Sequence, residues 1–274
     1  MLLVGGFNEK YGELREIAFY GQNVEKRPLP RLSLSQCRFG HGALLQNNQL
    51  LVFGGGISNS AELIDLESAR IAKAPPMKEA RRLFAHVRLG EKVLAFGGVG
   101  TSTSCERLHL KHASWSAFCQ MPLARARHSA VELSGMVFLI GGNTAASLKS
   151  VGVFDPNQGG IWRRGPGLVT ERCSASAAVL GSRVFVSGGI PQLGSCEALD
   201  PREKVWRSVG ELNEPRFDHQ LIEIDGSLLA IGGGSNEGGK ALSSVEQFVP
   251  EVNKWEFVKP LESGRCNFQA VVLP

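Results

Sequence analysis

The sequence has no long apolar run and no cysteine motif. No stretch of about 18 apolar residues occurs, so no membrane-spanning helix is expected. Residues 1–10 lack a charged segment ahead of their short apolar run and do not resemble a secretory signal peptide. The six cysteines form no Cys-x-x-Cys pair and have no histidine at zinc-ligand spacing. We therefore expect reduced thiols in a cytoplasmic protein, which at 274 residues needs no disulfide framework.

The sequence also lacks a strong excess of charge of either sign. It has 30 basic and 26 acidic residues, which give a formal net charge of +4. The longest basic clusters are pairs, such as Arg81-Arg82 and Arg163-Arg164, so no nucleic-acid-binding segment is indicated. A hydrophobic content of 43% is that of an ordinary soluble globule. We expect neither nucleic acid nor membrane among its partners.

What the sequence does contain is a sixfold repeat. An apolar run that ends in Gly-Gly occurs six times, and successive first glycines are 49, 43, 44, 47 and 44 residues apart. This spacing is typical of units of four short strands, as in the blades of a β-propeller. The first glycines of the six pairs are Gly5, Gly54, Gly97, Gly141, Gly188 and Gly232.

The repeat has fixed internal distances. An arginine stands sixteen residues before the first glycine in five units: Arg38, Arg81, Arg125, Arg172 and Arg216. A tryptophan stands ten residues before an arginine in four units, the last of which precedes Arg265: Trp115, Trp162, Trp206 and Trp255. Four units carry Ser-x-Glu after the glycines, with Glu62, Glu106, Glu197 and Glu246. Pro28 and Ile71 replace tryptophan in units 1 and 2, so those blades should pack less well.

Each unit is interpreted as strand a from the arginine to a hairpin, strand b up to Gly-Gly, strand c at Ser-x-Glu and strand d at the tryptophan. The pattern Arg…His/Phe…Gly-Gly…Ser-x-Glu…Trp resembles the kelch repeat over essentially the whole chain, and residues 244–265 are similar to the kelch-like (BTB-kelch) proteins of animals. The resemblance implies an all-β fold, a six-bladed propeller with four antiparallel strands per blade. We expect residues 1–274 to form a single propeller domain.

The two chain ends predict how the ring closes. Residue 1 begins strand b of the first unit, whereas residues 265–273 form a strand a with no strand b after it. Joining the ends places Arg265 fourteen residues before Gly5, close to the spacing elsewhere. Blade 1 should therefore consist of about residues 1–30 together with 265–273, which leaves no open sheet edge between the ends.

Histidines and cysteines are interpreted first as packing groups. His41, His128 and His219 each follow a repeat arginine by three residues, in a position that Phe84, Ala175 and Phe268 occupy elsewhere. A position that accepts histidine, phenylalanine or alanine favours packing over metal binding. Cys105 and Cys196 share an apolar position of strand c and should be buried. Three cysteines flank repeat arginines and could be partly exposed, and whether they are reactive stays open: Cys37, Cys173 and Cys266.

The repeat arginines are expected to bond loop carbonyls at the blade junctions, the alternative being a ring of positive charge around the channel. Arg127, two residues after Arg125, lies in a position that varies between units: Gly40, Leu83, Ser174, Asp218 and Asn267. Alternation along strand a would point this position the same way as the arginine, near the loops. Variable polar residues on a fixed scaffold are a common feature of recognition surfaces.

The b–c loops, between strands b and c, vary in length and are rich in serine, threonine, asparagine and glycine. Together with the d–a loops they form the predicted partner-binding face. Its residues are Arg127, Asp218, Asn267, Ser174, Tyr11, Asn59, Ser102, Asn143, Gln192 and Asn236.

No catalytic residue, cofactor or metal is expected. The four glutamates recur in one position, whereas catalysis needs a unique constellation. The kelch copper oxidases use tyrosine ligands, and only Tyr11 and Tyr20 occur here. Glu214 and Asp218 begin the Glu-x-x-x-Asp-x-x-x-His pattern of the iron-dependent specifier proteins, but residue 222 is isoleucine.

The kelch-like resemblance implies a protein-binding module, a substrate receptor in a cullin-type ubiquitin ligase. In that family a separate BTB domain contacts the cullin, and no such segment is found in these 274 residues. We expect either a domain of a longer protein or a stand-alone adaptor. Two alternatives remain open: an actin-binding kelch protein, and a small-molecule enzyme such as a sialate or sugar epimerase.

Overall fold

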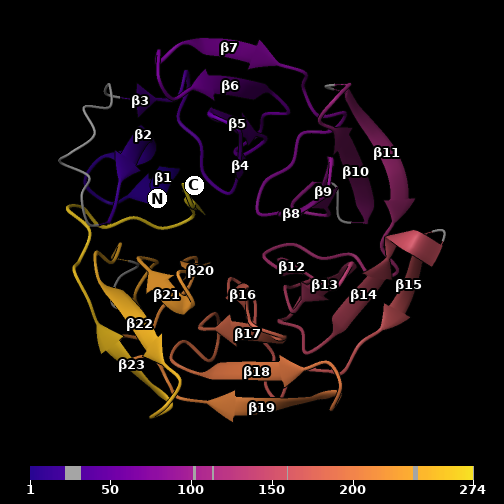
Figure 1. The fold of residues 1–274 in the computed structure, drawn as a ribbon, viewed down its shortest axis with the longest axis vertical. Coiled ribbons are helices and arrows are strands. Elements are labelled where there is room, and N and C mark those ends of the chain that lie inside the picture. Colours follow the sequence, from indigo (N-terminus) through magenta and orange to yellow (C-terminus); the bar gives the residue numbers. More distant parts are fainter. Residues whose placement is uncertain (22–31, 101–102, 113, 159, 237–239, 274) are drawn as a thin grey trace.

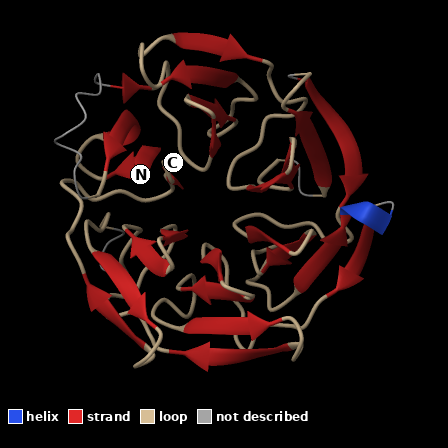
Figure 2. Ribbon diagram, viewed as in Figure 1, coloured by secondary structure: helices blue, strands red, loops and turns tan. Residues whose placement is uncertain are grey.

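The structure is a computed structural model that describes residues 1–21, 32–100, 103–112, 114–158, 160–236 and 240–273. Figure 1 shows six blades arranged around a central axis, and Figure 2 shows that almost all of the regular structure is strand. Each blade is a four-stranded antiparallel sheet. The six-bladed, all-β prediction is confirmed. Within the described residues no helix has the length and apolar character needed to cross a membrane.

Five blades are continuous in sequence, in the order a, b, c, d. Blade 2 contains β4 (Gly42–Gln46), β5 (Gln49–Phe53), β6 (Ala61–Asp65) and β7 (Ile71–Ala74). Blade 3 contains β8 (Ala85–Leu89), β9 (Lys92–Phe96), β10 (Ser104–His109) and β11 (Ser114–Gln120). Blade 4 contains β12 (Ser129–Leu133), β13 (Met136–Ile140), β14 (Val151–Asp155) and β15 (Ile161–Arg164), with a 3-10 turn at Pro156–Gln158. Blade 5 contains β16 (Ser176–Leu180), β17 (Arg183–Ser187), β18 (Cys196–Asp200) and β19 (Val205–Val209). Blade 6 contains β20 (Gln220–Ile224), β21 (Ser227–Ile231), β22 (Val245–Val249) and β23 (Lys254–Phe257).

Blade 1 is assembled from both chain ends. Its strands are β24 (Gln269–Val271), β1 (Leu2–Asn8), β2 (Gly12–Phe19) and β3 (Leu32–Ser33), in that order across the sheet. β24 pairs with β1 through Leu2 opposite Val271, and a further bridge joins Phe7 to Cys266. Figure 1 shows the two termini side by side in this blade. The predicted closure is confirmed, while residues 22–30 of the predicted blade lie outside the described residues.

The core lies between blades rather than within a single layer. Strand b is buried along its length: Leu50, Val52 and Phe53 of β5 are all fully buried. The tryptophans fill inter-blade space, as when Trp115 of blade 3 packs its ring 5.1 Å from that of Phe53 in blade 2. In blade 2, Ile71 stands where tryptophan recurs and is 44% exposed. Blade 2 therefore covers its outer strand less completely, as expected, while Pro28 of blade 1 lies outside the described residues.

The glycine pairs join neighbouring blades. In all six blades the second glycine donates its N–H to the carbonyl of the next blade's repeat arginine, at 2.8–3.1 Å. At the first position a Cβ on Gly141 would lie 2.4 Å from the Arg172 carbonyl oxygen, and Gly141 also has a positive φ of 60°. Only glycine meets both requirements without strain, because it has no Cβ. The glycines therefore serve blade packing.

Candidate functional site

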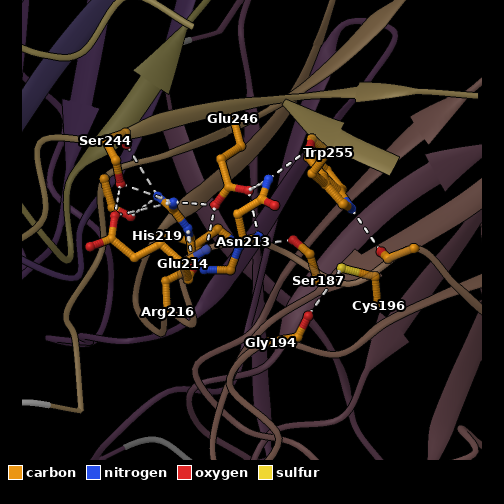
Figure 3. Close-up of polar contacts among 12 residues, drawn as sticks. Ser187, Gly194, Cys196, Asn213, Glu214, Arg216, His219, Ser244, Glu246 and Trp255 are labelled. Atoms are coloured by element: carbon orange, nitrogen blue, oxygen red, sulfur yellow. Dashed lines mark hydrogen bonds and ion pairs between the residues drawn. The ribbon is translucent and has the colours of Figure 1, made fainter. Parts of the chain in front are cut away.

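The repeat arginines form a buried layer beneath the loops, which we call the arginine layer: Arg38, Arg81, Arg125, Arg172, Arg216 and Arg265. In blade 6, shown in Figure 3, Arg216 donates to the Gly232 carbonyl at 2.8 Å and to the Glu246 carboxylate at 2.6 Å. Arg216 and Glu246 are both fully buried. Because the same carbonyl bond recurs in blades 2 to 6, the structural interpretation of these arginines is confirmed. The alternative of an exposed charged ring is wrong for this layer.

The repeated glutamates complete the layer by holding the d–a loops. Glu246 accepts the backbone N–H groups of Asn213 and Glu214, which precede strand a of the same blade. The corresponding carboxylates make the same kind of bonds in blades 2, 3 and 5. Arginine thus fixes the b–c loop and glutamate fixes the d–a loop, so each buried pair positions both loops of one blade.

Two blades depart from this pattern. Blade 4 has Gly152 in place of the glutamate, and among the described residues Arg125 donates to the carbonyls of Gly141 and Ser150 and to the Ser150 hydroxyl. Burial without a carboxylate lowers the pKa of Arg125 to about 10. In blade 1, Arg265 instead reaches Glu16 of β2 at 2.7 Å, a carboxylate that is 60% exposed.

Two residues beyond the arginine layer, the chain forms a second structure, which we call the inner ring: Gly40, Leu83, Arg127, Ser174, Asp218 and Asn267. Each inner-ring N–H donates to the carbonyl of the preceding blade's inner-ring residue, at 2.8–3.0 Å, so six bonds close a circle. All six residues have positive φ, between 51° and 58°. This backbone conformation is easy for glycine and tolerable for asparagine and aspartate, but unfavourable for leucine and arginine.

The positive φ corrects one prediction. Strand alternation was expected to point Arg127 the same way as Arg125. Instead Arg125 bonds the carbonyls of Gly141 and Ser150, whereas Arg127 lines the central cavity and bonds Ser174. Alternation does not apply because the chain is left-handed, not extended, at residue 127.

The side chains of the inner ring divide it into a polar and an apolar part. Arg127 Nη1 donates to Ser174 Oγ at 3.2 Å and lies 3.8 Å from Asp218 Oδ2, which also accepts from Asn267 Nδ2 at 2.9 Å. Blades 2 and 3 contribute only Gly40 and Leu83 on the other side. Burial raises the pKa of Asp218, while Ser174, Arg127 and Asn267 act in the opposite direction. The Arg127 side chain is 37% exposed, against 8% for Asp218.

The inner ring lines a central cavity of about 240 Å³, together with the first residues of the strands a. The cavity takes contributions from several blades because every strand a faces the axis. The structure therefore brings together four of the predicted site residues, all on its polar side: Arg127, Ser174, Asp218 and Asn267.

Those of the other predicted residues that the structure describes lie on the b–c loops and do not line this cavity. Tyr11 is 64% exposed, Asn59, Gln192 and Asn236 are also exposed, and Asn143 is half-buried. Asn59 Nδ2 donates to the Met77 carbonyl at 2.9 Å and so holds its own loop. Ser102 lies outside the described residues.

The loops and the inner ring belong to the same end of the molecule. In five blades the residue just before the inner-ring residue forms a β-bridge with the residue that directly follows a glycine pair, as between Ala126 and Asn143. The b–c loops therefore start beside the inner ring. The prediction from sequence missed the apolar side chains of this face. Phe7, Val99 and Ile190 directly follow glycine pairs and are 38–39% exposed. Their variation within an otherwise regular repeat was the available signal.

The three repeat histidines are buried at blade junctions, as the packing interpretation predicts. Burial lowers the pKa of His41 and His128 to about 3, and that of His219 well below its ordinary value. His219 Nε2 is 2.8 Å from Ser187 Oγ of the neighbouring blade. The described residues contain no group of three or more side chains suited to holding a metal ion.

The cysteines that flank the arginines differ in exposure. Cys37 is exposed, but Cys173 and Cys266 are buried, so partial exposure was wrong for these two. The reason is that both lie in the β-bridges that join strand a to the b–c loops. Burial raises the pKa of Cys266 to about 12, which disfavours its thiolate. Cys105 and Cys196 are buried, as expected.

Comparison with known proteins agrees with this architecture. The kelch motif model matches residues 171–213 and 215–262. The chain is 26% identical to human Kelch-like protein 23 over 83% of this chain and 42% of that protein, and 29% identical to human Kelch-like protein 34 over 79% and 38%. It is also 26% identical to Beta-scruin of Limulus polyphemus over 64% and 22%. The chain spans about two fifths of the length of the two kelch-like relatives.

These matches cover the same repeat that the geometry defines. The matched segments include Arg172, Arg216, Glu197 and Glu246, the residues of two complete buried pairs. The chain is therefore a six-bladed β-propeller in which residues 171–213 and 215–262 match the kelch motif, and it is similar to the kelch-like proteins.

Proposed function

We propose that this propeller is a protein-interaction module that binds its partner on the face formed by the inner ring and the b–c loops. The observation that carries the proposal is the contrast at Arg127. Its side chain is 37% exposed and its Nη1 lies 3.8 Å from Asp218 Oδ2, whereas every arginine of the arginine layer is buried. Arginine is among the residues enriched at binding hot spots.

The apolar side chains support the same face. Phe7, Val99 and Ile190 directly follow glycine pairs, and Ile57 in the b–c loop of blade 2 is 92% exposed. Arginine and aromatic side chains are enriched in interfaces, while the charged rim mainly sets specificity. A partner that covers the inner ring would contact both kinds of group at once.

The finer proposal is that the partner is the substrate of a cullin-type ubiquitin ligase. It is supported by the similarity to the kelch-like proteins, of which this chain spans about two fifths. In cells, loss of the gene should raise the steady-state level of a captured partner. If partner level and ubiquitination do not change, the ligase role is contradicted while the binding role stands.

The binding role is tested by capture with the isolated chain. Arg127→Glu should abolish recovery of the partner, because it reverses the one exposed charge of the inner ring. The matched control is Arg202→Glu, an exposed arginine in the turn between β18 and β19, at the other end of the strands. Equal recovery with Arg127→Glu, Arg202→Glu and the unmodified chain would place the binding surface elsewhere.

A small-molecule function, such as sugar epimerisation, is the second candidate, and the polar central cavity favours it. Turnover of a sugar that Asp218→Asn abolishes, with the unfolding transition unchanged, would support the enzyme and displace the interaction proposal. The actin alternative is tested separately by cosedimentation of the chain with filamentous actin.

A further inference from the structure

Two cysteines of blade 3 face one another across its outer pair of strands. In the register of β10 and β11, Cys105 lies directly opposite Cys119, and a β-bulge follows immediately at Glu106. Both side chains join the same apolar cluster, in which Phe154 and Trp162 pack from blade 4. The two thiols therefore project from the same face of the blade. Directly paired residues of an antiparallel ladder have Cα atoms about 4.5–5.5 Å apart, within the range of about 4.4–6.8 Å that a disulfide spans.

The corresponding pair in other blades contains no second thiol. Ala61 lies opposite Ala74 in blade 2, and Cys196 lies opposite Val209 in blade 5. In blade 6 the same backbone position pairs Val245 with Val258. The repeat thus needs only small apolar groups here. Blade 5 offers an internal control, since Cys196 occupies the environment of Cys105 without a cysteine across from it.

The two thiols are not equivalent. Cys105 is fully buried, whereas Cys119 is half-buried. Interaction with Cys119, together with burial, raises the pKa of Cys105, whereas interaction with Cys105 lowers the pKa of Cys119. Because the thiolate is the nucleophile in thiol oxidation, Cys119 is the first to react. Cys105, held beside it, is placed to resolve the product.

We propose that Cys105 and Cys119 form a reversible disulfide within blade 3, with a hydroperoxide as the oxidant. The Cys119 thiolate attacks the peroxide O–O bond, forms a sulfenic acid and releases an alkoxide or hydroxide, which takes up a proton. The Cys105 sulfur then attacks the Cys119 sulfur and displaces water. In total two thiols lose two electrons and two protons, and the peroxide is reduced to water and an alcohol, or to two waters. A dithiol reductant reverses the reaction.

The bond would close the hairpin at the end of blade 3 that carries its b–c loop. Cys105 follows Ser104, whose hydroxyl accepts from the buried Arg81, and Met121 donates its N–H to the Thr103 carbonyl. The disulfide would fasten the outer strand β11 to β10 just below these contacts.

The experiment treats the chain with one equivalent of hydrogen peroxide under native conditions and counts free thiols after denaturation. We expect the count to fall from six to four and to return to six after a dithiol reductant. Arg107 and Lys111 lie between the two cysteines, so a non-reducing tryptic digest should yield the two cysteine peptides linked.

Three variants make the result specific, and each uses a residue that the repeat already accepts in that position: Cys105→Ala, Cys119→Val and the control Cys196→Ala. Folding is checked first by the thermal unfolding transition. Only the control should still lose two thiols. The proposal is overturned if the unmodified chain loses no thiol pair, if the linked peptides contain other cysteines, or if Cys119→Val loses two thiols as the unmodified chain does.

Discussion

The arginine layer and the inner ring lie two residues apart in every blade, but they differ in kind. The layer keeps the same residue in all six blades, and its arginines are 0–5% exposed. The inner ring has a different residue in each blade, although its backbone bonds are the same throughout. The repeated side chains hold the loops, and the varied ones are presented to whatever approaches the axis. We propose that the repeated positions govern stability and that the varied positions govern recognition.

The largest expected effect is at Arg216. Arg216→Ala leaves Glu246 buried and without its cation, which should lower the free energy of unfolding by about 3–5 kcal/mol. Chemical denaturation measures this, with the exposed Arg207→Ala as the control. The double variant Arg216→Met, Glu246→Leu should recover part of the loss, because no buried charge then remains unpaired. A loss at Arg216 no larger than that at Arg207 would contradict the role of the layer.

Blade 4 offers a smaller effect within the same layer. Arg125→Ala removes bonds to the Gly141 and Ser150 carbonyls but leaves no buried carboxylate, since blade 4 has Gly152. The expected loss is about 1–3 kcal/mol. The difference between the losses of unfolding free energy in Arg216→Ala and Arg125→Ala measures the cost of leaving Glu246 buried without its cation. Equal losses would show that the carboxylate has no separate role.

The buried histidines predict acid sensitivity. His128 is neutral in the folded protein because burial lowers its pKa to about 3, whereas in the unfolded chain it titrates near 6.5. The unfolded state therefore binds more protons between these values, and stability should fall as the pH drops below about 6.5. The slope is about 1.4 kcal/mol per pH unit for each such histidine. Phe84 and Phe268 occupy the same repeat position in other blades, so His128→Phe should be tolerated. It should reduce the slope of unfolding free energy against pH by the contribution of one histidine. An unchanged slope would contradict burial of the neutral form.

The smallest effect on stability is expected at Arg127. Its contacts are partly exposed and its nearest carboxylate oxygen is 3.8 Å away, so Arg127→Ala should change the free energy of unfolding by less than about 1 kcal/mol. Alanine does not relieve the strain of the positive φ at residue 127, whereas glycine does. Arg127→Gly should therefore be at least as stable as Arg127→Ala. A loss of unfolding free energy as large as that of Arg216→Ala would show that Arg127 stabilises the fold as the arginine layer does.

The fold was predictable because the repeat supplies six independent copies of one spacing. The sixteen-residue interval from arginine to glycine is a direct hydrogen bond in the structure, from Arg216 to Gly232 in blade 6. Ring closure followed from the same interval counted across the chain ends. The pairing of arginine with glutamate was suggested by their recurrence, although recurrence alone does not show which carboxylate meets which arginine.

The site was less predictable, since its features depend on departures from regular geometry. Leucine and arginine rarely adopt positive φ, so the sequence does not indicate the left-handed backbone at Leu83 and Arg127. Strand alternation therefore predicted the wrong direction for the Arg127 side chain. The β-bulge that leaves Cys119 opposite Cys105 depends on the register of two strands, which the spacing of cysteines does not specify. Exposure of Phe7, Val99 and Ile190 depends on how the loops leave the blades.

The most direct test of the difference between the arginine layer and the inner ring is the affinity of a captured partner for the Arg127→Glu variant, measured by calorimetry. The unfolding free energy of the same variant is measured in parallel. The account predicts at least tenfold weaker binding, about 1.4 kcal/mol, with stability changed by less than about 1 kcal/mol. Unchanged affinity, or weaker binding explained entirely by unfolding, would contradict it.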